Sequence, residues 1–94
     1  MYNIVGTRGI GKTYRLLELA NEAKGVVICS NPRAMREKAA ILGFTEIQGF
    51  ISYRDSVDER TGQDTFIDDL ELYAKALVGR DLKGYTYTID NYED

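Results

Sequence analysis

The residues best suited to chemistry lie near the N-terminus, in the run from Gly6 to Thr13. This run, GTRGIGKT, satisfies the pattern G-x-x-x-x-G-K-[ST], in which glycines allow consecutive backbone N–H groups to surround an anion. The pattern predicts that Lys12 contacts the terminal phosphates of a nucleotide and that the Thr13 hydroxyl contacts Mg²⁺. The other residues expected to bind the nucleotide are Gly6, Thr7, Arg8, Gly9, Ile10, Gly11 and Tyr14.

A strand must precede such a loop and a helix must follow it. Residues 2–5 are a short apolar strand, and residues 12–24 place Leu16, Ala20 and Ala23 at helical spacing. The N-terminal end of that helix would add partial positive charge beneath the phosphates. Because both flanking elements are present, we favour phosphate binding over the alternative of a glycine-rich turn without a ligand.

The rest of the chain alternates strands with helices. Gly25 is expected to cap the first helix in a left-handed conformation, and the apolar residues 26–29 are typical of a strand in a buried parallel sheet. The next helix starts at Pro32, capped by Ser30 or Asn31. The remaining expected elements are strands at residues 50–53, 65–67 and 85–89, and a helix after residue 69 whose inner face is Leu70, Tyr73, Ala74 and Leu77. This alternation predicts one α/β domain over residues 1–94.

These features resemble the P-loop NTPases. Beyond the loop, the run from Phe66 to Asp68 looks like the second motif of that family, a strand ending in an aspartate that holds Mg²⁺. The resemblance is to the branch with an additional strand between the two motifs, which includes helicases, RecA-like ATPases and AAA+ proteins. It implies a minimal three-layer α/β sandwich with a mainly parallel four- or five-stranded sheet. It also implies ATP or ADP as the nucleotide, with Thr13 and Asp68 at the metal.

The second motif leaves two alternatives open. Asp90 also ends an expected strand, but we prefer Asp68 because a helix and another strand follow it. Asp69 stands where this branch usually carries a glutamate that polarises the attacking water, so the resemblance implies a catalytic role for its shorter side chain. Acidic residues at a helix N-terminus also stabilise the helix, which alone could explain both Asp68 and Asp69.

Three other segments gain a role only by resemblance. The last strand is similar to one that lies beside the phosphate-loop strand and presents a polar sensor, for which Thr88 and Asn91 are the candidates. Arg8 is similar to the arginine of phage terminase loops, G-x-R-G-x-G-K-[ST], where it could neutralise transition-state charge. The alternative for Arg8 is an exposed side chain that only raises the local potential. Residues 29–33 resemble a helicase segment that contacts nucleic acid, although a capped helix with a basic face explains them equally well.

Composition limits the class of protein. One cysteine and no histidine in 94 residues exclude an intramolecular disulfide and a Cys/His zinc site. The net charge of −3 argues against nonspecific nucleic-acid binding, although residues 1–44 carry seven basic against three acidic residues and residues 45–94 carry five against twelve. The chain shows no membrane span or signal-peptide pattern, so we expect a cytoplasmic protein, in the host cytoplasm if it is phage-encoded.

The residues and the resemblance together predict a weak or partner-dependent Mg-ATPase of phage type, linked to DNA processing, with Lys12, Asp69 and Arg8 as catalytic residues. In layout the chain is similar to small P-loop proteins of phage and prophage origin. The alternatives are a nucleotide-binding interaction module that does not hydrolyse and, less favoured, a small nucleotide kinase. Expected partners are a second copy or another protein at an open sheet edge, with weaker support for nucleic acid.

Overall fold

The computed structural model describes residues 3–5, 11–59, 62–86 and 92–93 of the chain. Within them, three strands form a parallel sheet in which β2 (Val26–Cys29) lies between β3 (Gly49–Ser52) and β4 (Thr65–Ile67). Two short strands, β1 (Asn3–Ile4) and β5 (Tyr92–Glu93), pair in parallel as a separate sheet. The helices of these residues are α1 (Lys12–Ala23), α2 (Pro32–Ile41) and α3 (Leu70–Val78), with a short 3-10 helix, η1 (Asp55–Val57), after β3. The chain is therefore an α/β protein, as predicted.

The central strand β2 holds the sheet together. All four of its residues are buried, which matches the expectation for an apolar, β-branched run in a parallel sheet. Val27 pairs with Phe50 of β3 on one side and with Phe66 of β4 on the other. Because the strands are parallel, their carboxyl ends meet at one edge of the sheet, where the chain continues from β4 into Asp68.

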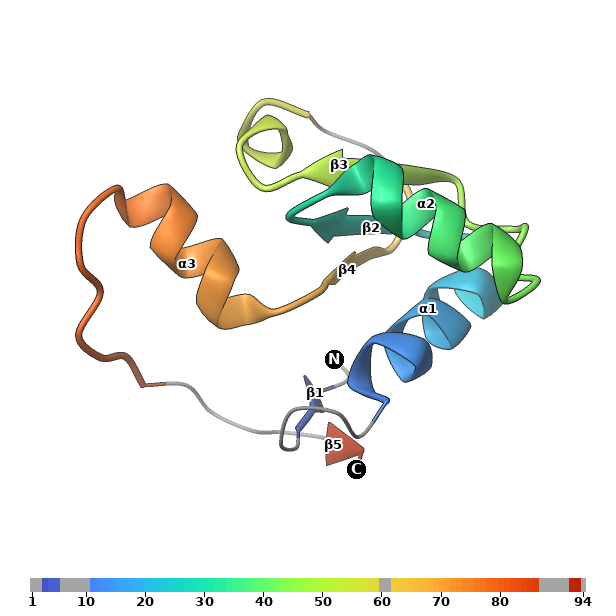
Figure 1. Cartoon of the computed structure of the whole chain (residues 1–94), viewed down its shortest axis with the longest axis horizontal. Helices are drawn as coiled ribbons and strands as arrows, with labels where there is room; N and C mark the ends of the chain where they lie inside the picture. Colours follow the sequence, from blue (N-terminus) through green and yellow to red (C-terminus); the bar gives the residue numbers. More distant parts are fainter. Residues whose placement is uncertain (1–2, 6–10, 60–61, 87–91, 94) are drawn as a thin grey trace.

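Helices α1 and α2 lie side by side against one face of this sheet (Figure 1). The buried core joins Leu17 and Ala20 of α1 to Ala39 of α2 and to Val27 and Cys29, which share one side of β2. Partly buried residues pack around this core, namely Leu16, Met35, Phe44, Ile47, Phe50 and Phe66. The face of the sheet that carries Val27 and Cys29 is thus the one on which the hydrophobic core is built.

The buried face of α1 differs from the predicted stripe. Leu17 and Leu19 are buried together with Ala20, whereas Ala23 is exposed. Leucine buries more apolar area than alanine, so the rotation of the helix that covers Leu17 and Leu19 gives the larger gain in free energy.

The ends of the helices follow local chemistry, with one correction. Asn31, rather than Ser30, caps α2, since its side chain accepts a hydrogen bond of 3.1 Å from the backbone N–H of Ala34. The left-handed residue after α1 is Lys24 (φ 52°), not Gly25 as predicted. Gly25 is needed for a different reason, because a Cβ atom there would collide with the carbonyl oxygen of Asp64.

The described residues do not form the predicted sheet of four or five strands. Residues 85–86 belong to no strand, residues 87–89 of the expected last strand lie outside the described residues, and the last strand observed is β5. Tyr85 and Thr86 have high strand propensity, but strand formation also requires a neighbour with which to pair. β5 does lie beside β1 in parallel, the neighbour expected for the last strand.

Helix α3 does not form the second helical layer predicted for a three-layer sandwich. It stands apart from the three-stranded sheet (Figure 1), and none of its residues is buried. Leu70 and Leu77, predicted for its inner face, are 51% and 42% exposed. The spacing of apolar residues determines which side chains share a helix face, but burial also requires a second surface. The ring of Tyr73 makes the aromatic contact of this helix, edge-on to Tyr53 at a centroid distance of 5.5 Å.

Candidate functional site

The candidate site lies where β4 ends and α1 begins. Thr13, in the first turn of α1, donates a hydrogen bond of 3.0 Å from its hydroxyl to Oδ1 of Asp68. The backbone N–H of Asp68 donates to the carbonyl oxygen of Ile28 at 2.9 Å, which ties the end of β4 to β2. The structure therefore brings together two residues 55 positions apart in the sequence, the two that the motifs assign to the metal.

The N-terminus of α1 is built differently from those of α2 and α3. Its N-cap is Gly11, which is left-handed (φ 79°) and has no side chain with which to cap the first turn. In α2 and α3 the N-cap side chains of Asn31 and Asp69 accept a backbone hydrogen bond. An anion is a suitable acceptor for backbone N–H groups at such a terminus. Lys12, the first residue of α1, is partly buried beside this terminus.

The electrostatics at Asp68 are set mainly by burial. Withdrawal from water raises the pKa of this carboxyl, the hydrogen bond from Thr13 lowers it, and the charge of Asp69 raises it further. The positive charges of Lys38 and Lys12 act in the opposite direction. The contacts around Asp68 thus do not fully offset the cost of burying its negative charge, and a cation beside the carboxylate would stabilise that charge.

The donor set suits Mg²⁺ held jointly with phosphate. Among the residues that the structure describes, no three side chains of His, Cys, Asp or Glu gather into a metal-binding group. Mg²⁺ is usually bound through one or two carboxylates together with waters and substrate phosphates, rather than by an all-protein cage. A single carboxylate, Asp68, with the neighbouring hydroxyl of Thr13 fits that mode of binding.

Several predicted site residues cannot be compared with this geometry. Gly6, Thr7, Arg8, Gly9 and Ile10 of the phosphate loop lie outside the described residues, as do Thr88, Asp90 and Asn91. The preference for Asp68 over Asp90 is therefore supported by the contact of Asp68 with Thr13 alone. Tyr14 is described, and its ring packs edge-on against Phe44 at 5.3 Å, next to the end of α2.

Asp69 has a defined structural role at the start of α3. Its side chain accepts a hydrogen bond of 3.1 Å from the backbone N–H of Leu72, so it is the N-cap of the helix. Its backbone is left-handed (φ 64°), a conformation that Asp and Asn tolerate better than most residues. The capping alternative raised by the sequence therefore accounts for Asp69 without a catalytic role.

Substitutions at Asp69 separate capping from catalysis. We expect Asp69→Asn to leave the free energy of unfolding within about 0.5 kcal/mol, because Asn caps helices as well as Asp does, whereas Asp69→Ala should cost about 1 kcal/mol. Urea denaturation measures both changes. Phosphate release from ATP should be the same for the wild-type protein and Asp69→Asn. Loss of phosphate release in a fully stable Asp69→Asn variant would instead assign the carboxylate to the chemistry.

Sequence reasoning alone did not identify Tyr53, which also contacts the site. It is 7% exposed, and its hydroxyl donates a hydrogen bond of 2.7 Å to the backbone carbonyl oxygen of Asp68. In the sequence, Tyr53 is the last residue of an expected strand, and nothing in the pattern pairs it with Asp68. The pairing follows from the strand order, in which β3, β2 and β4 end at one edge.

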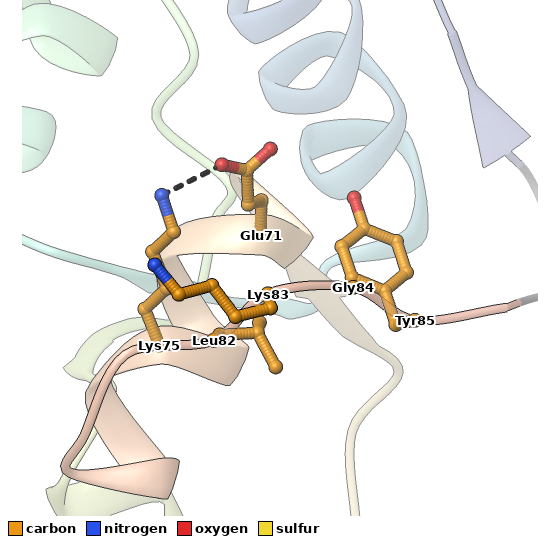
Figure 2. A pocket seen from close by; sticks show the side chains of 6 residues that line it. All are labelled: Glu71, Lys75, Leu82, Lys83, Gly84 and Tyr85. Carbon is orange, nitrogen blue, oxygen red and sulfur yellow. Dashed lines mark ion pairs between the residues drawn. The ribbon is translucent and has the colours of Figure 1, made fainter.

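A pocket of about 180 Å³ lies away from these residues, between α3 and the segment that follows it (Figure 2). An ion pair of 2.8 Å joins Glu71 and Lys75 on its helical side. Its lining residues are Glu71, Lys75, Leu82, Lys83, Gly84 and Tyr85. None of the predicted site residues is among them, so the phosphate and metal chemistry is not expected in this pocket.

Comparison with known proteins finds no match. No family model matches the chain, and neither a curated protein nor a solved structure matches it. In the part of the chain that the structure describes, no helix is long and apolar enough to cross a membrane. The resemblance to the P-loop NTPases is thus carried by the motif residues, and the functional interpretation rests on them and on the contact between Thr13 and Asp68.

Proposed function

We propose that this protein binds ATP or ADP together with Mg²⁺ at the N-terminus of α1. The observation that carries the proposal is the hydrogen bond between the Thr13 hydroxyl and the Asp68 carboxylate. Both groups offer oxygen atoms, the ligands that Mg²⁺ prefers. In the bound protein Thr13 would ligate the ion and Asp68 would hold it directly or through water. Lys12 would contact the β- and γ-phosphates.

The position of α1 supports the proposal that the two separate sheets belong to one continuous sheet. This helix packs against β1 as well as against β2 and β4, so the two separate sheets share one covering helix. We propose that β1 and β5 extend the sheet beyond β4 and give the four- or five-stranded P-loop NTPase sheet. Adenine is the proposed base, because the chain contains no [NT]-K-x-D run of the kind that reads guanine in GTPases.

We propose that hydrolysis is weak or depends on a partner. Asp69, the residue in the water-polarising position, already accepts a hydrogen bond as the cap of α3. A neighbouring molecule could supply an arginine. Among the described residues the outer edge of β3 is unpaired, and the extension beyond β4 leaves it open for a second copy or another protein to dock. The role in phage-type DNA processing rests on the resemblance of the loop. The capping by Asp69 also favours the second candidate, a nucleotide-binding module that does not turn over.

Calorimetric titration with ATP and with ADP in the presence of Mg²⁺ tests the binding proposal. We expect dissociation constants between about 1 μM and 1 mM, the usual range for enzyme substrates. A phosphate-release assay on the same sample then separates a slow ATPase from a non-hydrolysing module. Absence of binding by protein with native circular dichroism would contradict the proposed function.

A further inference from the structure

The backbone of Asp68 is held on both sides by neighbouring strands. Its N–H donates to the carbonyl oxygen of Ile28 in β2, at 2.9 Å. Its carbonyl oxygen accepts the hydroxyl of Tyr53, which directly follows β3, at 2.7 Å. The peptide units on either side of the Asp68 side chain are therefore connected to the two other strands of the sheet.

This support matters because the chain changes direction at this point. β4 has only three residues, and Asp68 lies beyond its last one. The next residue, Asp69, is left-handed (φ 64°) and starts α3, a helix without buried residues. Neither a long strand nor a packed helix thus fixes the orientation of Asp68. Asp68 is held instead by the hydrogen bonds to its backbone and by the one that its carboxylate accepts from Thr13.

Tyr53 is itself held in place. Its ring packs edge-on against Tyr73, and the Ser56 hydroxyl donates to its backbone carbonyl oxygen at 2.6 Å. Burial raises the pKa of the Tyr53 phenol to about 12, with smaller contributions from the charges of Asp68 and Asp69. A phenol is an O–H donor at neutral pH, so the Tyr53 hydroxyl can hold the carbonyl oxygen of Asp68.

We propose that Tyr53 is a positioning residue for the metal, whose hydroxyl holds the Asp68 backbone so that the carboxylate faces Thr13 and Mg²⁺. This inference rests on the proposed function. It predicts a specific defect, because Tyr53 acts on the metal through Asp68, whereas Lys12 would bind phosphate independently of Asp68 in the proposed site. Loss of the hydroxyl should thus weaken binding of ATP in Mg²⁺ more than binding of ATP in EDTA.

The test is calorimetric titration of ATP in Mg²⁺ and in EDTA for the wild-type protein, Tyr53→Phe and Tyr73→Phe. The quantity compared is the Mg²⁺-dependent gain, defined as the ratio of the dissociation constants in EDTA and in Mg²⁺. We expect Tyr53→Phe to lower this gain by about 3- to 10-fold, the loss of one buried hydrogen bond, while affinity in EDTA is unchanged. Tyr73→Phe removes a phenol from the same ring pair but keeps the bond to Asp68, so its gain should equal that of the wild type.

A double-mutant cycle strengthens the assignment. In an Asp68→Ala background, Tyr53→Phe should have no further effect on the Mg²⁺-dependent gain, because Tyr53 acts on the metal only through the Asp68 carboxylate. If Tyr53→Phe does not fold in plain buffer, the three proteins are compared in trimethylamine N-oxide, which strengthens folded states.

The other outcomes overturn the inference. An unchanged gain in Tyr53→Phe, with ATP bound normally by the wild type, would refute the role of Tyr53 and leave the proposed function standing. A parallel loss of affinity in Mg²⁺ and in EDTA would show general loosening of the site and would also refute it. Failure of the wild-type protein to bind ATP would refute the proposed function and this inference with it.

Discussion

Replacing Lys12 with alanine is expected to lower the affinity for ATP by roughly 10- to 150-fold. A hydrogen bond to a charged group contributes about 1.5–3 kcal/mol, and about 1.4 kcal/mol corresponds to a tenfold change in affinity. Lys12 is the first residue of α1, where alanine is an equally good helix former, so the fold should survive. Calorimetric titration with ATP in Mg²⁺ measures the change, and circular dichroism checks the fold.

Lys83→Ala is the matched control for this experiment. It removes the same charge from a side chain that is 87% exposed and 3.9 Å from Asp81, in the segment after α3. ATP affinity should stay within about twofold of the wild type, since an exposed ion pair contributes little. Equal losses in both variants would indicate a nonspecific effect of net charge, and full affinity in a folded Lys12→Ala variant would remove Lys12 from the site.

The isolated protein should hydrolyse ATP more slowly than ~1 s⁻¹, the lower end of typical enzyme turnover. Phosphoryl transfer depends on positioned charge, and an arginine supplied in cis or in trans accelerates it by about 10³–10⁵. Arg8 is the one arginine of the phosphate loop, and Asp69 is engaged as the cap of α3. If a neighbouring copy or a partner completes the site, turnover per molecule should rise steeply with protein concentration or on addition of that partner.

Phosphate release measured across a dilution series, with the oligomeric state followed by light scattering, tests this dependence. The sequence offers a neighbouring copy Arg33, Arg36, Arg54, Arg60 and Arg80, of which all but Arg60 lie in the described residues and are exposed. Of these, Arg33 extends into solvent, with a side chain that is 92% exposed. Fast hydrolysis by a monomer that is indifferent to dilution, and that Asp69→Asn abolishes, would show that the domain needs no added arginine.

Local sequence patterns were sufficient for the central strands and for one helix start. Residues 26–29 and 65–67 are strands with the predicted bounds. Helix α2 begins at Pro32, as predicted, and is capped by Asn31, one of the two residues predicted for that role. These elements are determined by side chains adjacent in sequence, through β-branched runs and capping hydrogen bonds. The burial of α3 was predicted wrongly because apolar spacing shows which residues share a face but not what that face contacts.

The site was predictable to the extent that it depends on strand ends. Thr13 and Asp68 could be expected together because the loop and the end of β4 belong to one edge of a parallel sheet, and they are in contact. Tyr53 could not be found in the same way. Its partner is a backbone carbonyl group, which every residue carries, and the contact exists only through the lateral order of β3, β2 and β4.

The nucleotide and its metal are proposed to bind together beside Thr13 and Asp68. Mn²⁺ accepts the same oxygen ligands as Mg²⁺, and as a paramagnetic ion it broadens the NMR signals of nearby amides. In spectra of the isotope-labelled protein with ATP, trace Mn²⁺ should broaden the amide signals of Thr13 and Asp68. The signals of residues 82–85, around the pocket beside α3, should change little. Without ATP, trace Mn²⁺ should not produce this pattern. Broadening centred on residues 82–85, or equal with and without ATP, would contradict the claim.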